Sequence, residues 1–210
     1  MKIDIISDVV CPWCYIGKKN LEAAMAQRPD IDFELQWFPY QLHPEAPLEG
    51  YNYIESIEKK YGKARFQMMF AQITQAGEAS GIRLNLEGIE RGANTLKAHR
   101  LLDVAFRKGG SALQNTLSES LFQAYFCDSR DIGDTEVLST IAADIGLDKD
   151  KVSDYLNSDD GVTDVKKQIN FSRQQGINSV PSFSIEGQFV LSGGQATAVF
   201  LSTIDRLAGC

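Results

Sequence analysis

The sequence predicts an α/β protein whose sheet is formed by strands from the two ends of the chain, with a helical block between them. Three observations predict this class. The first forty residues read as strand, helix and strand; residues from about 53 to about 173 show almost only helical periodicity; two short strands and a helix follow residue 176. Apolar residues recur every second position in a half-buried strand and at about 3.6-residue spacing in a helix. The predicted order is therefore β-α-β, a helical block, and β-β-α.

Length and composition are those of a globular protein. The chain has 210 residues, of which 43% are hydrophobic, so it can bury an ordinary core. Its net charge of −7 argues against a nucleic-acid partner, because phosphate binding needs clustered Lys and Arg. No apolar run approaches the roughly 18 residues of a membrane span. Asp4 and Asp8 interrupt the early apolar run, so we expect no secretion signal and a cytoplasmic location.

The amino-terminal unit begins with a strand over residues 2–7, a mostly apolar run rich in isoleucine. A helix is predicted over residues 15–27, and it ends before Pro29 because the residue preceding a proline avoids helical backbone angles. Apolar and polar residues alternate over residues 31–38, which predicts a second strand. A unit of this length normally joins parallel neighbours, so we expect the two strands to pair in parallel.

Four to six helices are predicted in the block that follows. Their apolar residues recur at helical spacing, and Asn, Asp or Gly stands at several expected ends. The expected features are a helix containing residues 66–73, a helix capped by Asn94 and ended by Gly109 and Gly110, a helix over residues 111–125, a helix over residues 135–144 capped by Asp134, and a helix over residues 163–175. Such short helices are marginally stable alone, so they must pack on one another.

The chain returns to strands after Gly176. Two strands and a terminal helix are predicted there, over residues 183–185, 189–191 and 195–207. Glu186 and Gly187 suit the hairpin turn between the strands. The expected organisation is one discontinuous domain, residues 1–45 and 176–210, and an inserted helical domain, residues 46–175.

Cys11 and Cys14 form the strongest functional signal. Their Cys-Pro-Trp-Cys tetrad follows the first strand and opens the helix. Disulfide exchange needs a thiolate nucleophile, and the unpaired amides and dipole of a helix start favour a negative charge at Cys11. The i, i+3 spacing places Cys14 on the same side, within bridging range. We therefore predict that an exposed Cys11 attacks a disulfide and that a more buried Cys14 resolves the mixed disulfide.

Pro12 and Trp13 separate the two cysteines. Pro12 suits the first helical turn, because its missing N–H would be unpaired there in any case. The two intervening residues influence the stability of the reduced form and hence the redox poise. We expect Trp13 to tune access and packing.

The cysteine pair has three possible roles besides redox chemistry. A zinc site needs about four ligands, commonly with a second Cys or His pair. Cys127 and Cys210 are isolated, however, and His43 and His99 lie far apart in the sequence. A structural disulfide is disfavoured in a reducing cytosol, and the third possibility is two buried cysteines without a chemical role. The spacing favours redox catalysis without a metal.

A second signal is Pro181, which stands just before the strand over residues 183–185. A proline there can be an ordinary edge-strand residue. Alternatively its bond to Val180 is cis, which fixes a tight turn. The motif is weak when taken alone.

Together the two signals resemble the DsbA-like branch of the thioredoxin superfamily, and within it the FrnE-like cytoplasmic dithiol–disulfide isomerases. The stretches that carry the resemblance are Ser7–Gly17, Ala98–Leu101, Leu121–Phe126 and Asp131–Ile132. The resemblance covers nearly the whole chain. It implies a thioredoxin fold with a large all-helical insertion.

By position, the resemblance makes Cys11 the nucleophile, Cys14 its partner and Pro181 a cis-proline beside the pair. The backbone of Val180 is then free to pair with a substrate strand, and the proline tends to keep metal off the dithiol. The resemblance implies disulfide- or dithiol-containing protein or small-molecule substrates. It implies no metal or organic cofactor, with glutathione as a candidate redox partner.

Two other functions stay open. Kappa-class glutathione transferases and 2-hydroxychromene-2-carboxylate isomerases share the architecture but typically have serine where this chain has Cys11, so a glutathione-dependent transferase or isomerase is the alternative. The other open function is not enzymatic: a binder of unfolded chains that uses an apolar lip formed by Trp37, Phe38, Tyr40 and Leu42. The sequence assigns no role to its remaining histidines and cysteines, and it leaves the oligomeric state open.

Overall fold

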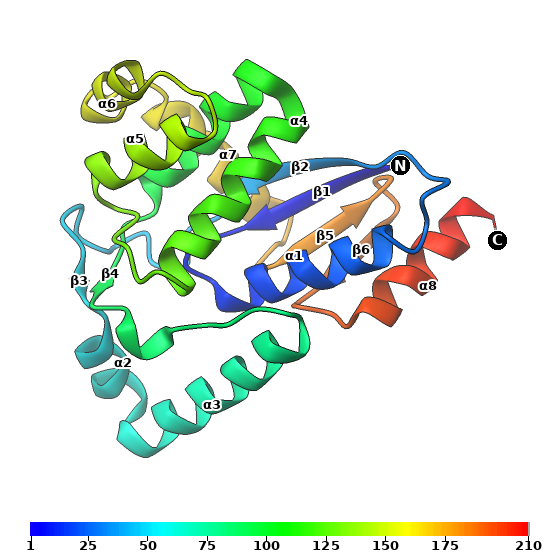
Figure 1. The fold of residues 1–210 in the computed structure, drawn as a ribbon, viewed down its shortest axis with the longest axis horizontal. Coiled ribbons are helices and arrows are strands. Elements are labelled where there is room, and N and C mark those ends of the chain that lie inside the picture. Colours follow the sequence, from blue (N-terminus) through cyan, green and yellow to red (C-terminus); the bar gives the residue numbers. More distant parts are fainter. Residues whose placement is uncertain (210) are drawn as a thin grey trace.

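The computed structural model describes residues 1–209 and contains a four-stranded mixed sheet in the order β2-β1-β5-β6 (Figure 1). β1 (Lys2–Ser7) pairs in parallel with β2 (Glu34–Pro39) and antiparallel with β5 (Ser182–Ile185). β5 pairs antiparallel with β6 (Phe189–Ser192). The predicted parallel pair and terminal hairpin are therefore confirmed.

Two helices pack together on one face of this sheet, α1 (Pro12–Met25) and α8 (Thr197–Ala208). Phe183 of β5 meets both: its ring lies 4.8 Å from that of Phe200 in α8, and its Cζ lies 3.0 Å from the place of a Cβ at Gly17 in α1. α1 begins three residues earlier than predicted, because Pro12 already has helical angles. Its first residue therefore follows Cys11 directly.

The segment between β2 and β5 is mainly helical, as expected. Its elements are β3 (Tyr51–Asn52), α2 (Tyr53–Tyr61), α3 (Lys63–Ala79), the 3₁₀-helix η1 (Leu86–Gly88), β4 (Arg91–Gly92), α4 (Leu96–Phe126), α5 (Thr135–Asp144), α6 (Lys149–Asn157) and α7 (Val162–Gln174). The small antiparallel sheet of β3 and β4 corrects the expectation of an all-helical insertion. The division into two domains stays a prediction.

α4 combines two predicted helices. Gly109 and Gly110 were expected to end one helix, and the structure shows a kink there instead, with Gly110 at φ 64° and ψ −159°. That backbone conformation is open essentially only to glycine. The residue directly before α4 is Thr95, whose side chain makes no capping bond. Asn94 supplies one, because its Oδ1 accepts from the amide of Leu96 over 3.0 Å, and its own amide donates to the carbonyl of Ala46. The predicted cap at Asp134 is confirmed by a 2.9 Å bond from the amide of Val137.

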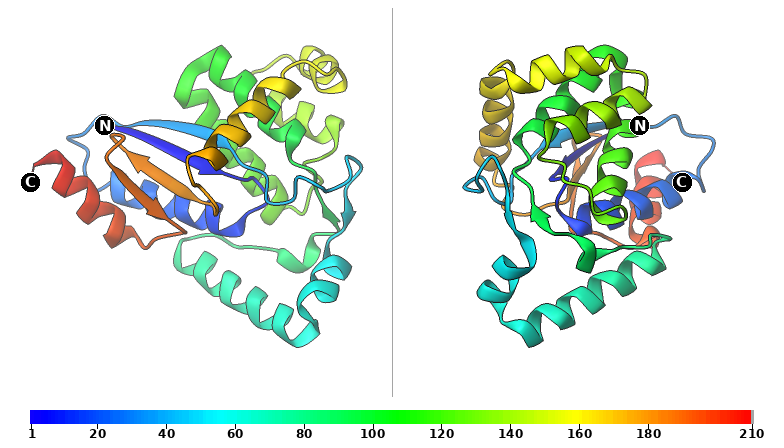
Figure 2. Two further views of the ribbon diagram at one scale, coloured as in Figure 1. Left: turned by 180° about the vertical axis from the view of Figure 1, so that it is seen from behind. Right: turned by 60° about the vertical axis from the view of Figure 1, so that its left-hand side comes forward.

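The start of α1 lies between two groups of helices, α2 with α3 and α4 with α5 to α7 (Figures 1 and 2). Aromatic side chains join α1 to α4: the ring of Tyr15 stacks on that of Phe122 at 5.1 Å. Gln114 of α4 binds the backbone of Trp37 in β2 through both its oxygen and its nitrogen, at 2.8 and 3.0 Å. The helical block thus holds the end of the sheet where the cysteines lie. Within residues 1–209, no helix has the length and apolar character needed to cross a membrane.

Candidate active site

The cysteine pair lies at the junction of β1 and α1. Cys11 precedes the first helical residue, Pro12, and has extended backbone angles of φ −97° and ψ 111°. The amide of Cys14 donates to the carbonyl of Cys11 over 3.0 Å, which closes the first turn. No acidic side chain lies in that turn. Cys11 thus stands at the amino-terminal end of a helix, where the unpaired amides and the helix dipole stabilise negative charge in general.

Cys11 is more deeply covered than predicted. Its exposed fraction is 5% and that of Cys14 is 1%, and both thiols are free. The Cys11 thiol donates to the carbonyl of Val180 over 3.7 Å, and the phenol of Tyr53 lies close enough to respond to its charge. The expectation of an exposed attacking sulfur is wrong for this reduced state, because long-range packing covers it. The Val180 carbonyl, expected to be free for a substrate, accepts this contact instead.

Cys14 is held as a neutral thiol. Burial raises its pKa well above the ordinary value, and the hydrogen bond and charge of Cys11 raise it further. The hydroxyl of Ser7 and the backbone amide of Asp8 lower the pKa, since both donate to the thiolate form. Cys11 and Cys14 lie one turn apart at the start of α1, close enough for the charge of one to act on the pKa of the other. Cys14 must therefore lose a proton before it can displace a substrate from Cys11.

We expect Cys14 in a Cys11→Ser variant to react with iodoacetamide only at strongly alkaline pH. The variant removes the Cys11 contributions to the raised pKa of Cys14, but burial, the largest cause, remains. An ordinary thiol, with a pKa of about 8.5, reaches its full alkylation rate near about pH 9.5. The rate at Cys14 should still be rising about tenfold per pH unit there, because a pKa above the pH keeps the thiolate fraction small. Mass spectrometry of the alkylated peptide measures the profile, and a plateau by about pH 9.5 contradicts the expectation.

The bond between Val180 and Pro181 is cis, as the resemblance implied. Two glycines let this turn and the following segment approach α1. Pro181 Cγ lies 3.3 Å from the place of a Cβ at Gly17, and the carbonyl of Trp13 lies 2.9 Å from that of a Cβ at Gly194. A side chain at either glycine would push the turn away from the cysteine pair. The structure therefore places Val180 and Pro181 beside the segment that carries Cys11 and Cys14. Trp13, which lies between the two cysteines, packs against the segment at Gly194.

A buried hydrogen bond between Asp8 and His99, which sequence reasoning missed, lies beside the cysteines. Asp8 and His99 are 1% and 3% exposed, with Oδ1 and Nε2 3.2 Å apart. Nε2 also lies 2.8 Å from the carbonyl of Tyr40, which can only accept, so Nε2 carries a proton. The second oxygen of Asp8 accepts from the amide of Leu42 at 2.8 Å, and the carbonyl of Asp8 accepts from the amide of Cys11 at 3.0 Å. Asp8 thus joins the cysteine turn to α4 and to the segment after β2.

Tyrosines from the inserted segment also approach the site. The ring of Tyr53 lies 6.4 Å from that of Tyr125. Burial raises the pKa of Tyr53, and the nearby phenol of Tyr51 and thiolate of Cys11 raise it further. A phenol with a raised pKa stays protonated and can donate a hydrogen bond to an anion. Nothing in the local sequence marked these residues, because they reach the site only through the packing of α2 and α4.

The remaining candidate residues have different settings. His43 pairs with Glu45, their Nδ1 and Oε1 atoms being 3.5 Å apart. Cys127 is partly buried after α4 and has a free thiol, whereas Cys210 lies outside the described residues. In the expected apolar lip, Trp37 and Tyr40 are buried in the core and Leu42 is exposed. Two of its four residues are therefore not on the surface, and Phe38 is half-buried.

Metal-binding side chains are not gathered around the cysteine pair. In the part of the chain that the structure describes, no group of three or more His, Cys, Asp or Glu side chains is placed to hold an ion. The expectation that the protein uses no metal or organic cofactor stays a prediction.

Comparison with known proteins gives matches over the whole chain. A sequence profile of the DSBA-like thioredoxin domain matches residues 2–205. The uncharacterized protein YwbO of Bacillus subtilis (strain 168) is 27% identical over 209 residues, covering 97% of this chain and 95% of that protein. The crystal structure of the probable DsbA oxidoreductase SCO1869 from Streptomyces coelicolor superposes with a TM-score of 0.89 at 27% identity, covering 100% of this chain and 90% of that one.

Two solved structures at 14% identity share the fold. A 2-hydroxychromene-2-carboxylate isomerase superposes with a TM-score of 0.76 over 99% of this chain and 96% of that one. The cytosolic disulfide reductase DsbM from Pseudomonas aeruginosa, in a structure with GSH, gives a TM-score of 0.71 over 100% of both chains. These similarities confirm the predicted thioredoxin fold and its helical insertion.

Proposed function

This chain belongs to the family of the DSBA-like thioredoxin domain, and from that premise we propose that it is a thiol–disulfide oxidoreductase working through Cys11 and Cys14. One observation carries the proposal: Cys11 stands directly before the first residue of α1, and the buried thiol of Cys14 lies one turn later in the same helix. That is the arrangement of an attacking and a resolving sulfur. Pro12, Trp13, Val180 and Pro181 support the pair by shaping and covering the turn.

The exchange has two steps. The Cys11 thiolate attacks one sulfur of a substrate disulfide; a Cys11–substrate bond forms, the substrate S–S bond breaks, and the departing thiolate takes a proton from solvent. Cys14 then loses its proton and attacks Cys11, so that a Cys11–Cys14 disulfide forms and the second substrate thiol leaves. Two electrons pass from the protein dithiol to the substrate. The same steps in reverse oxidise a dithiol, and a release and recapture of one substrate rearranges its disulfides.

The test is a trapping experiment in which the second step is blocked. In a Cys14→Ser variant that also carries Cys127→Ser and Cys210→Ser, a disulfide-linked peptide should accumulate on Cys11 as a stable one-to-one adduct. Serine cannot displace the bound sulfur, because its hydroxyl is neither a thiolate nor able to form a disulfide. Mass spectrometry of the intact protein and its peptides measures the adduct and its position.

The matched control keeps Cys14 and lacks Cys127 and Cys210. It should give the internal disulfide and free peptide thiol instead of an adduct, with one disulfide consumed per protein. If the Cys14→Ser chain captures no peptide, or captures it at a rate no faster than a free cysteine does, the proposal is wrong.

We propose glutathione as the redox partner and the cytoplasm as the location. The support is the fold shared with DsbM, which is described as a cytosolic disulfide reductase and was solved with GSH. A glutathione-dependent transferase or isomerase is the competing function. Two measurements separate them. Saturable binding of reduced glutathione in isothermal titration that survives Cys14→Ser favours the competing function. Reaction of Cys14→Ser with glutathione disulfide that leaves one glutathione on Cys11 and releases the other as a thiol favours redox exchange.

A further inference from the structure

Tyr40 links the two segments that meet at Cys11, and neither step of the exchange uses it. These segments are the cysteine turn, residues 8–11, and the Val180 turn, residues 178–181. Tyr40 directly follows β2 and is 8% exposed. Its backbone amide donates to the carbonyl of Ser7 over 2.9 Å, and its carbonyl accepts from Nε2 of His99 at 2.8 Å. The backbone of Tyr40 is thus fixed beside the cysteine turn.

The side chain of Tyr40 reaches the Val180 turn. Its hydroxyl donates to the carbonyl of Asn178 over 3.3 Å. The guanidinium of Arg173, in the last turn of α7, lies over the Tyr40 ring at 5.3 Å from its centre. The same guanidinium donates to the carbonyl of Gln41 at 3.0 Å. These contacts hold the ring, and through its hydroxyl they hold the backbone two residues before Val180.

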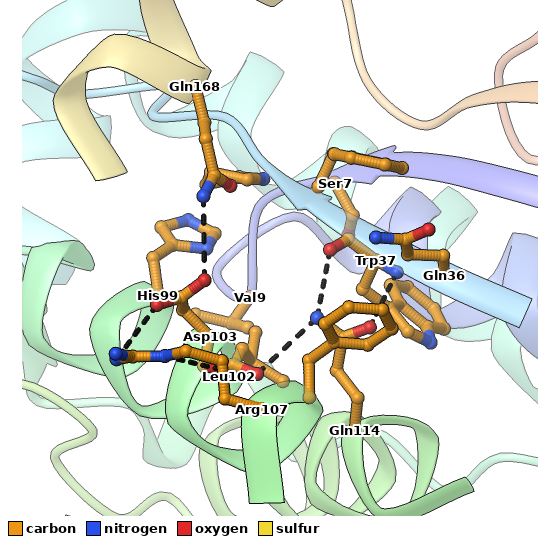
Figure 3. A pocket seen from close by; sticks show the side chains of 13 residues that line it. Ser7, Val9, Gln36, Trp37, His99, Leu102, Asp103, Arg107, Gln114 and Gln168 are labelled. Atoms are coloured by element: carbon orange, nitrogen blue, oxygen red, sulfur yellow. Dashed lines mark hydrogen bonds and ion pairs between the residues drawn. The ribbon is translucent and has the colours of Figure 1, made fainter. Parts of the chain in front are cut away.

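The strand that leads to Tyr40 is itself joined to the helical block (Figure 3). Gln114 of α4 binds the backbone of Trp37 in β2, and Gln168 of α7 donates to Asp103 of α4 over 3.5 Å. The same two helices supply the groups that hold the carbonyl and the ring of Tyr40. The position of Tyr40 is therefore set by packing that does not depend on the state of the cysteines.

A direct contact between the two segments is lost when Cys11 reacts. The Cys11 thiol donates to the carbonyl of Val180 over 3.7 Å. Cys11 gives up its proton to solvent before it attacks, and a thiolate, or a sulfur bonded to substrate, has no hydrogen to donate. Reaction therefore frees the Val180 carbonyl for a backbone amide of the substrate. It also removes a contact that held the Val180 turn, whereas the contact from the Tyr40 hydroxyl remains.

Other contacts hold the Val180 turn from the side of β6. The hydroxyl groups of Ser179 and Ser192 are 3.3 Å apart, and the carbonyl of Pro181 accepts from the amide of Gly193 over 2.8 Å. These contacts bind a side chain and the carboxyl end of the turn. The backbone at its amino end is bound from the opposite side, by Tyr40.

We propose that Tyr40 is a positioning residue that keeps the Val180 backbone in place for a polypeptide substrate after Cys11 has released it. The inference rests on the proposed function and concerns its first step. A backbone that is already held loses little freedom when a substrate strand pairs with it, and this favours binding. A small disulfide without a peptide backbone does not use the pairing. The Tyr40 hydroxyl thus favours disulfides carried by polypeptides.

Capture kinetics test this role with Tyr40→Phe, which removes one oxygen atom and keeps the ring. The variant is made in the chain with Cys14→Ser, Cys127→Ser and Cys210→Ser, where Cys11 is the remaining thiol. Its second-order rate constant for capture of a disulfide-linked peptide should fall about fivefold, as expected for the loss of one net hydrogen bond. The rate constant for bis(2-hydroxyethyl) disulfide should keep the parent value. Mass spectrometry of the intact protein over time measures both.

Two controls separate positioning from a general disturbance of the site. Tyr155→Phe removes a tyrosine hydroxyl in α6 that accepts from Arg107, also over 3.3 Å, and should change neither rate constant. The second control is a peptide of the same sequence with N-methylated amides on both sides of its cysteine, which cannot donate to Val180. The parent should capture it more slowly than the unmodified peptide, and Tyr40→Phe should slow that capture no further, because the two changes remove the same interaction.

The outcomes are distinct for the two proposals. Tyr40→Phe overturns the role of Tyr40 if it slows the peptide and the small disulfide equally, if it slows neither, or if it slows both peptides equally. A parent chain that captures no peptide at Cys11 overturns the proposed exchange, and with it the role of Tyr40.

Discussion

A Cys11→Ser variant is expected to reduce disulfides no faster than the uncatalysed background. In a coupled assay with glutathione disulfide or insulin as the oxidised substrate and dithiothreitol as the reductant, turnover should fall by about 10³-fold or more, as it does when a covalent nucleophile is removed. The reason is chemical: serine at the start of α1 is a neutral alcohol near neutral pH, so no anion stands there to attack sulfur. Cys14 does not substitute for it, because it is buried and its pKa is raised by that burial.

Two companion variants make this result specific. Cys127→Ser alters a partly buried thiol after α4 and should leave turnover unchanged. Cys14→Ser should retain a single rapid capture of substrate but lose turnover, because the adduct on Cys11 is not resolved. Residual turnover above about one tenth of the parent in Cys11→Ser would show that another group performs the attack.

A His99→Leu variant is expected to lose about 3–5 kcal/mol of unfolding free energy, the cost of leaving a buried charge without its partner. Asp8 is 1% exposed, and the lost imidazole is the group 3.2 Å from its Oδ1. The bond from the amide of Leu42 remains but does not balance the charge. Urea unfolding followed by tryptophan fluorescence measures the loss, with the midpoint shifting while the slope is preserved.

The double variant Asp8→Asn, His99→Leu tests the cause. It keeps an oxygen that can accept from the Leu42 amide and removes the unpaired charge, so it should be more stable than His99→Leu alone. His43→Leu is the control, since His43 is partly exposed and its pair with Glu45 is at the surface; it should change stability by less than about 1 kcal/mol. Equal losses in His99→Leu and in the double variant would contradict a charge-pairing role for His99.

Elements with strong local signals were predicted well. The terminal hairpin, the parallel β1–β2 pair and α5 with its cap at Asp134 each depend on residues close in the sequence. α6 was missed because it is short and mostly polar, with Val152 and Leu156 as its buried residues. β3 and β4 have two residues each, too few for an alternating pattern to show. Asn94 does accept from the amide of Leu96 at the start of α4, as a cap would, but its second bond, to the carbonyl of Ala46, joins it to a partner far away in the sequence that no local signal predicts.

The functional site also has features that depend on neighbouring residues and features that depend on long-range contacts. The placement of Cys11 before a helix, with Cys14 one turn later, follows from a strand, a proline and an i, i+3 spacing, and these are local properties of the chain. The contacts of the Asp8 side chain with His99 and with the amide of Leu42 are not local. A carboxylate at the end of a predicted buried strand, three residues before Cys11, was the available signal for it.

The sequence by itself determined the two reacting sulfurs, their order along the chain and the helix start that favours an anion, because bond geometry and helical spacing act over a few residues. Only the tertiary structure decided how deeply Cys11 is covered and that His99 holds Asp8. Those features join residues that are distant along the chain, and their burial is set by how α4 and the Val180 turn pack against β1 and α1. Local periodicity carries no information about such long-range packing.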